Sequence, residues 1–140
     1  MLFGEQQQSL LSNYHEATSK MDPEAIATCF RHNAKIRLAG DDMDILGREN
    51  IITFFTNVFS LSQYFQRIHL RHFMDKNKVL LIGKVKIISQ KHPTKQTIFE
   101  VPELFQFDDS GLISELVIFF DRENFLDIYD NDSTYECNKS

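Results

Sequence analysis

The C-terminal half of the chain contains four segments rich in Val, Ile, Leu and Phe, separated by short turn-forming stretches. The segments cover residues 64–75, 78–90, 96–107 and 112–121. Between them lie Lys76-Asn77, His92-Pro93-Thr94 and the stretch from Asp108 to Gly111. Connections this short join antiparallel neighbours, because a parallel crossover needs about a dozen residues or more. The sequence therefore predicts an antiparallel meander.

The N-terminal half shows helical spacing instead. Apolar residues recur three and four positions apart over 10–21 and again over 51–59, as on the buried face of a helix. Asp22-Pro23 is a typical start of a further helix, since Asp caps the N-terminus and Pro fits the first turn. A short strand is expected over 34–39. Helices followed by a meander predict an α+β fold in which the helices cover one face of the sheet.

Composition and charge exclude several classes of protein. The 140 residues carry a net charge of -5, and the cysteines at 29 and 137 are too far apart for metal-ligand spacing. None of the five glycines fits a nucleotide-binding fingerprint, and an acidic chain lacks the basic surface that general nucleic-acid binding needs. The first residues lack a secretory signal, and no apolar run approaches the ~20 residues of a membrane span.

These features predict one domain over residues 1–126 and an acidic, flexible tail over 127–140. We expect a cytoplasmic protein without metal, cofactor, membrane or nucleic-acid partner. Basic residues gather between Arg67 and Lys95, and we interpret them as a solvated face or the rim of a dimer.

Glu103 is unusual within its segment. The odd-numbered positions from 97 to 107 are otherwise mostly apolar, so alternation places Glu103 on the buried face. A tight turn over 108–111 pairs it with Leu116, and pairing further back brings Gly83 close. Apolar surroundings raise the pKa of a carboxyl group, so we expect Glu103 to hold a proton near neutrality and to donate a hydrogen bond to a ligand oxygen. The structural alternative is that Glu103 lies near the rim of the sheet, or that another group inside the protein pairs with it.

Two further residues have both a functional and a structural interpretation. Tyr14 either directs its hydroxyl toward Glu103 or is a core tyrosine bonded to the backbone. Alternation over 64–75 turns His72 inward with its even-numbered neighbours, where it is a candidate base or a half-exposed strand histidine. The same alternation turns the odd-numbered residues, among them Phe65 and Arg67, outward.

The order of several short patterns resembles one known superfamily. The patterns are the run from Tyr14 through Asp22, Ile26, Phe30 and Ala34, then Gly47, Ile51 and Phe54, then VPELFQF and SGLISELVIFF. Together they resemble the nuclear transport factor 2-like superfamily over residues 14–124, especially its ketosteroid isomerase and SnoaL-like polyketide cyclase branches. The resemblance implies a cone-shaped, curved antiparallel sheet whose concave face is covered by three N-terminal helices.

The resemblance also implies roles for individual residues. Tyr14 matches the isomerases' oxyanion-hole tyrosine, and Glu103 falls where those enzymes keep an aspartic acid neutral. Leu38, however, stands at the position of their proton-shuttling aspartate, and Phe55 replaces a tyrosine of their hydrogen-bond network. Asp42 or His72 would then have to supply the base.

The sequence thus leads to the hypothesis of an enclosed apolar pocket for a small, carbonyl-bearing hydrophobic molecule. Tyr14 and Glu103 would hold the oxygen, and the chemistry would be a cofactor-free acid–base isomerase, cyclase or hydratase reaction. The expected wall residues are Phe30, Leu38, Phe54, Phe55, Phe99, Val101, Leu116, Ile118 and Phe120.

The alternative is a non-catalytic ligand-binding or protein-interaction module. Under either hypothesis we expect a homodimer through the outer face of the sheet. Val117 and Phe119, with Phe65 and Phe73, are the apolar residues expected on that face.

Overall fold

The computed structural model describes residues 3–40, 42–121 and 123. The tail predicted over 127–140 lies outside these residues. The helices are α1 (Phe3–Ser19), α2 (Pro23–Ala27) and α3 (Arg48–Ser60). The strands are β1 (Phe30–Leu38), β2 (Met43–Leu46), β3 (Ser62–Asp75), β4 (Lys78–Ser89), β5 (Gln96–Glu100), β6 (Glu103–Phe107) and β7 (Ile113–Ile118). Within the described part of the chain, no helix is long and apolar enough to cross a membrane.

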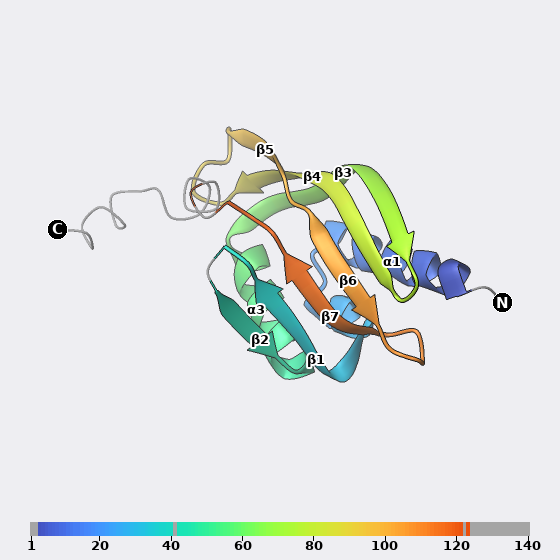
Figure 1. Cartoon of the computed structure of the whole chain (residues 1–140). Coiled ribbons are helices and arrows are strands. Elements are labelled where there is room, and N and C mark those ends of the chain that lie inside the picture. Colours follow the sequence, from blue (N-terminus) through green and yellow to red (C-terminus); the bar gives the residue numbers. More distant parts are fainter. Residues whose placement is uncertain (1–2, 41, 122, 124–140) are drawn as a thin grey trace.

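The strands form one curved, mostly antiparallel sheet in the order β2-β1-β7-β6-β4-β3, with β5 also paired to β4. The helices lie together on one side of this sheet (Figure 1). The predicted α+β architecture and its antiparallel meander from β3 to β7 are therefore confirmed. The sequence did not reveal β2, nor the parallel pairing of β1 with β7 that joins the two halves of the chain. The first strand is also longer than expected, because it begins at Phe30.

The helix boundaries follow from local chemistry. The Asp22 carboxylate accepts a hydrogen bond from the Ala25 amide at 3.1 Å, and Pro23 occupies the first turn of α2. This confirms the predicted start of that helix. Gly47, with φ of 84°, turns the chain into α3 through a conformation that other residues rarely adopt. One face of α3 is buried against the sheet.

A β-bulge in β3 controls which of its side chains reach the interior. Ile68 pairs with Lys84 and Arg71 pairs with Ile82, so two residues of β3 lie opposite Gly83 alone. A Cβ atom at Gly83 would lie 2.4 Å from Leu70 Cδ2 and 3.3 Å from the Ile68 carbonyl oxygen. Glycine therefore makes room for the bulge.

The bulge reverses the alternation of side chains along β3. Before it, the odd-numbered Phe65 and Arg67 point inward. Phe65 is 9% exposed, and the side chain of Arg67 is 6% exposed. After it, Phe73 is 52% exposed. The expectation that all odd-numbered residues face outward is thus wrong for Phe65 and Arg67, because it assumed unbroken alternation.

The segment predicted as one strand over 96–107 is two strands. The break falls at Val101 and Pro102, where the chain leaves one stretch of β4 and joins another. Glu103 pairs with Ile118 and with Leu81, not with Leu116 and Gly83 as expected. Both pairings are two residues away from the expected ones. A shift of two residues changes the partner of Glu103 but keeps its side chain on the same face of the sheet.

Candidate functional site

A buried cluster of Tyr14, Arg67 and Glu103 joins α1 to the sheet. Tyr14 Oη donates to Glu103 Oε2 at 3.1 Å, and Arg67 Nη2 donates to the same oxygen at 3.0 Å. Arg67 Nη1 lies 2.5 Å from Glu103 Oε1, which completes a two-point ion pair. Tyr14 and Glu103 are both fully buried. The Arg67 guanidinium also lies over the Tyr14 ring, 5.6 Å from its centroid.

Burial dominates the electrostatics of the cluster. It raises the pKa of Tyr14, and the Glu103 charge adds to that rise, so the hydroxyl remains a donor. Burial also raises the pKa of Glu103, while the Arg67 charge and the hydrogen bonds from Tyr14 and Arg67 oppose the rise. For Arg67, burial lowers the pKa, but the charge of Glu103 and the neighbouring Tyr14 more than offset it. The guanidinium therefore stays charged.

Glu103 is buried, as the sequence predicted, and burial raises its pKa. Of the two interpretations of Tyr14, the structure shows the one in which the hydroxyl donates to Glu103. The surroundings of Glu103, however, make it an acceptor of hydrogen bonds from Tyr14 and Arg67 rather than a free acid facing a ligand. The internal partner that the sequence left open is Arg67, which had been expected on the outer face. Gly83 within a strand was the available signal, since an isolated strand glycine often marks a bulge.

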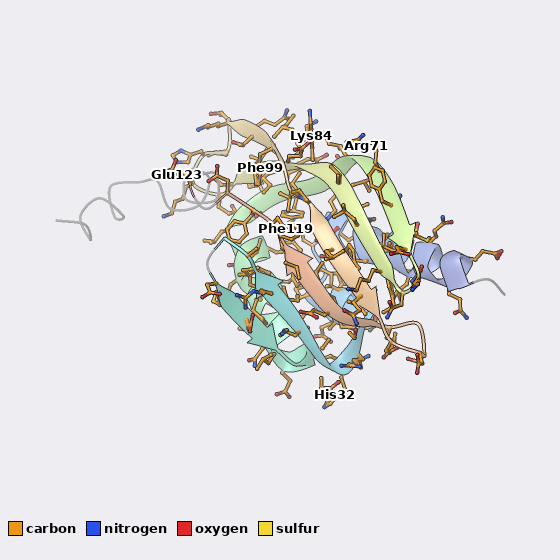
Figure 2. The ribbon with its side chains drawn as sticks, viewed as in Figure 1. His32, Arg71, Lys84, Phe99, Phe119 and Glu123 are labelled. Carbon is orange, nitrogen blue, oxygen red and sulfur yellow. The ribbon has the colours of Figure 1, made fainter. Side chains whose placement is uncertain are left out.

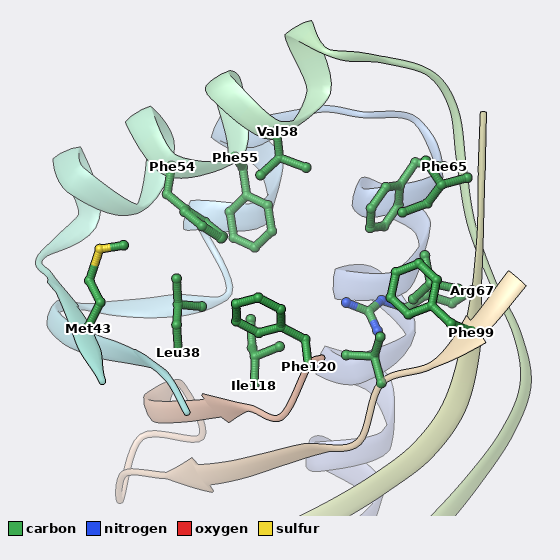
Figure 3. Close-up of a pocket in the computed structure, with 13 residues that line it drawn as sticks. Leu38, Met43, Phe54, Phe55, Val58, Phe65, Arg67, Phe99, Ile118 and Phe120 are labelled. Carbon is green, nitrogen blue, oxygen red and sulfur yellow. The ribbon is translucent and has the colours of Figure 1, made fainter. Parts of the chain in front are cut away.

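A cavity of about 170 Å³ opens between α3 and the sheet. Its walls are apolar except for Arg67, whose guanidinium points into the space near Phe120 (Figure 3). Arg67 Nε is buried and has no hydrogen-bond partner in the part of the chain that the structure describes. Tyr14 and Glu103 are not among the lining residues, so they contact the cavity only through Arg67. The described residues that line it are Leu38, Met43, Phe54, Phe55, Val58, Phe65, Arg67, Val85, Ile87, Phe99, Val101, Ile118 and Phe120.

Most residues expected in the pocket wall do line this cavity. Phe30 and Leu116 do not; both are fully buried in the core, where Phe30 packs edge-on against Tyr14 with ring centroids 6.1 Å apart. Sequence reasoning missed Met43, Val58, Phe65, Arg67, Val85 and Ile87 as lining residues. The bulge explains Phe65 and Arg67, and Met43 lies on the unexpected strand β2.

The two candidate bases lie away from the cavity lining. Asp42 is at the surface, where it forms an ion pair with Arg37, and its side chain is 85% exposed. His72 is exposed on β3, beyond the bulge, and pairs with Leu81 across the strands. The described residues include no group of three or more His, Cys, Asp or Glu placed to hold a metal ion.

His15 is a further titratable group next to this cluster; the residue is half-buried and its ring nitrogens are shielded from solvent. Neither of its ring nitrogens has a hydrogen-bond partner, and its ring lies edge-on to Tyr14 with centroids 5.5 Å apart. Burial, followed by the charge of Arg67 and the proximity of His72, lowers the pKa of His15 to about 3. The imidazole is therefore neutral at physiological pH.

No protein-family model and no curated protein matches this sequence. Solved structures do match its fold. A protein from Xanthomonas campestris pv. campestris described as a polyketide cyclase superposes with a TM-score of 0.79 at 13% identity, over 92% of this chain and 100% of that one. A protein from Shewanella denitrificans described as a SnoaL-like polyketide cyclase superposes with a TM-score of 0.71 at 18% identity. The match covers 90% of this chain and 98% of that one.

A third structure, from Catenulispora acidiphila, is described as a protein with a ketosteroid isomerase-like fold in complex with trimethylamine. It gives a TM-score of 0.76 at 12% identity, over 86% of this chain and 91% of that one. At these identities the likeness concerns the fold and leaves the activity open. The architecture inferred from the sequence is confirmed: this chain has the nuclear transport factor 2-like fold of the SnoaL-like and ketosteroid isomerase-like proteins.

Proposed function

We propose that this chain binds a small, apolar, carbonyl-bearing molecule in the cavity, with Arg67 donating a hydrogen bond to the carbonyl oxygen. The observation that carries the proposal is one buried cation in an otherwise apolar wall, with its Nε–H unpartnered. Ligand sites commonly combine apolar walls with a few polar groups that orient the ligand. An unpartnered buried donor is costly, and a ligand acceptor would remove that cost.

The cavity volume limits the size of the ligand. A dry cavity of about 150 Å³ lined by Leu, Ile and Phe accepts benzene, so about 170 Å³ suits a molecule with a single ring. We therefore propose single-ring ketones, rather than steroids, as the first ligands to examine.

Acid–base catalysis of the isomerase, cyclase or hydratase type stays a prediction, with Tyr14, Glu103, Asp42 and His72 as its candidates. Such a reaction needs a base within hydrogen-bond reach of the substrate, directly or through one water. Among the lining residues that the structure describes, none carries a carboxylate or an imidazole. Arg67 by itself binds and polarises a carbonyl group, so the function that the geometry favours is ligand binding.

Filling the cavity tests this proposal without touching Arg67. Val58 lines the cavity from α3, and Val58→Phe places a ring in the space that the ligand would occupy. We expect wild-type protein to bind acetophenone saturably in a calorimetric titration and the variant to bind it about tenfold more weakly or not at all. Asn57→Phe adds the same ring at an exposed position of α3 and should bind like wild type. Equal affinity in all three proteins would place acetophenone outside the cavity.

A second candidate function is a dimeric interaction module, favoured by apolar side chains outside the core. Phe119 is 42% exposed next to the end of β7, and Ile98 is 45% exposed on β5. Figure 2 also shows Arg71 and Lys84 together along β3 and β4. We propose that the outer face of the sheet joins two copies of this chain, with the basic side chains at its rim.

The dimer proposal makes a mass prediction. Light scattering coupled to gel filtration should give twice the chain mass of 16.4 kDa. Phe119→Ser should shift the protein toward the monomer, because it removes apolar surface that the contact would bury. His32→Ser changes an exposed residue on β1 and should leave the mass unchanged. A monomeric wild-type protein at high concentration would contradict the proposal.

A further inference from the structure

The charge of the cavity depends on a residue that does not line it. Arg67 is the one charged group among the lining residues that the structure describes. Its two terminal nitrogens face the Glu103 carboxylate at 2.5 and 3.0 Å, and the side chains of Arg67 and Glu103 are 6% and 0% exposed. The positive charge beside the cavity is therefore already balanced inside the protein. The Nε–H of Arg67 has no partner among the described residues and is covered in the empty cavity, so a ligand oxygen reaches it only through a small turn of the side chain.

The described groups packed around the ion pair add no charge at neutral pH. From α1, Tyr14 donates to Glu103, and burial raises the pKa of its hydroxyl. His15 also approaches Arg67 from α1, and with a pKa lowered to about 3 it is neutral. On β6 the odd-numbered neighbours of Glu103 are the buried Phe105 and Phe107. The buried charge of the cluster is thus close to zero.

This balance distinguishes between two kinds of ligand oxygen. A neutral carbonyl oxygen accepts the Nε–H bond and leaves the charge balance unchanged. A carboxylate would place a second negative charge against one guanidinium between apolar walls, where an unbalanced charge is expensive. Such a ligand would have to bind together with a proton, or displace the contact between Arg67 and Glu103.

We infer that Glu103 sets the charge selectivity of the cavity, so that the pocket accepts a neutral single-ring molecule with one acceptor oxygen and rejects a carboxylate of the same size. The inference rests on the proposed function and extends it to the class of ligand. Glu103 acts through Arg67 and is a positioning and specificity residue, not one that touches the ligand.

Acetophenone and benzoate form a matched pair of probes. Both are planar single-ring molecules with the same number of non-hydrogen atoms, and they differ in charge. Their affinities for wild-type protein, Glu103→Gln and Glu100→Gln can be compared by calorimetry at pH 8. Glu103→Gln keeps an acceptor for Tyr14 and Arg67 but removes the balancing charge. Glu100→Gln is the matched control, because it removes a carboxylate from an exposed position on β5, opposite Lys84.

The expected result is a reversal of preference. Wild-type protein and Glu100→Gln should bind acetophenone at least about tenfold more tightly than benzoate. Glu103→Gln should bind benzoate at least about tenfold more tightly than wild-type protein does. If Glu103 had a purely structural role, Glu103→Gln would bind both ligands more weakly and would not gain affinity for the anion. Far-UV circular dichroism and a thermal melt establish that the variant is folded.

The other outcomes are equally informative. If wild-type protein binds acetophenone but Glu103→Gln shows no gain for benzoate, the inference is overturned and the proposed function stands. If wild-type protein binds benzoate as tightly as acetophenone, the inference is overturned without any variant, which covers the case in which Glu103→Gln does not fold. If wild-type protein binds neither probe, the proposed function fails and the inference fails with it.

Discussion

Arg67→Met should lower the free energy of unfolding by about 3–5 kcal/mol, because it leaves the Glu103 carboxylate buried without its cation. The two side chains are 6% and 0% exposed, so solvent cannot replace the lost partner. Urea denaturation followed by circular dichroism measures the change. The loss should be smaller at pH 5 than at pH 8, because Glu103 without Arg67 can remain buried by taking up a proton.

Two controls separate this effect from ordinary loss of an arginine. Arg37→Met breaks surface ion pairs with Asp44 and Asp42, and the Arg37 side chain is 39% exposed, so we expect a much smaller loss of stability than in Arg67→Met. Arg67→Met combined with Glu103→Leu removes both charges and should recover much of the stability lost in the single variant. A loss below about 1 kcal/mol in Arg67→Met would mean that the ion pair contributes little to folding.

His15 should make the protein markedly less stable in mild acid. Its pKa in the folded protein is about 3, below the value of about 6.5 expected in the unfolded chain. Because the unfolded state then binds the proton first, the contribution of His15 to stability is complete above about pH 6.5 and declines as the pH falls toward 3. The difference corresponds to about 2 kcal/mol between pH 7 and pH 5.

His15→Phe isolates this contribution from that of the carboxylates. The ring can keep its edge-on contact with Tyr14, and the two unpartnered nitrogens disappear. We expect the variant to be at least as stable as wild type at pH 7 and to lose about 2 kcal/mol less on acidification to pH 5, measured by urea denaturation at both values. His32→Phe alters an exposed imidazole and should retain the wild-type slope, since His15 is still present. Parallel slopes in wild type and His15→Phe would show that His15 is not the group responsible.

Local chemistry made much of the fold predictable. The turns at 76–77 and 108–111 impose antiparallel neighbours whatever surrounds them, and Asp22 caps α2 with a bond inside its own first turn. The meeting of Tyr14 with Glu103 was also predictable. It required only that each residue lie on the interior face of its own element, and a register error of two residues preserves that face.

The amino-acid sequence by itself determined the helical first half, the antiparallel meander and the burial of Glu103, because each depends on contacts along the chain or on a period of two. It did not determine β2 or the break between β5 and β6. Only the tertiary structure decided the site. One extra residue in β3 turns Arg67 inward, and the guanidinium then meets a carboxylate 36 positions away. The bulge reverses the side chains between it and a second register shift at the start of β3, between Ser62 and Tyr64. Its position depends on how Gly83 and Leu70 pack across two strands. That packing made Glu103 the partner of Arg67 and left Arg67 as the polar group that faces the cavity.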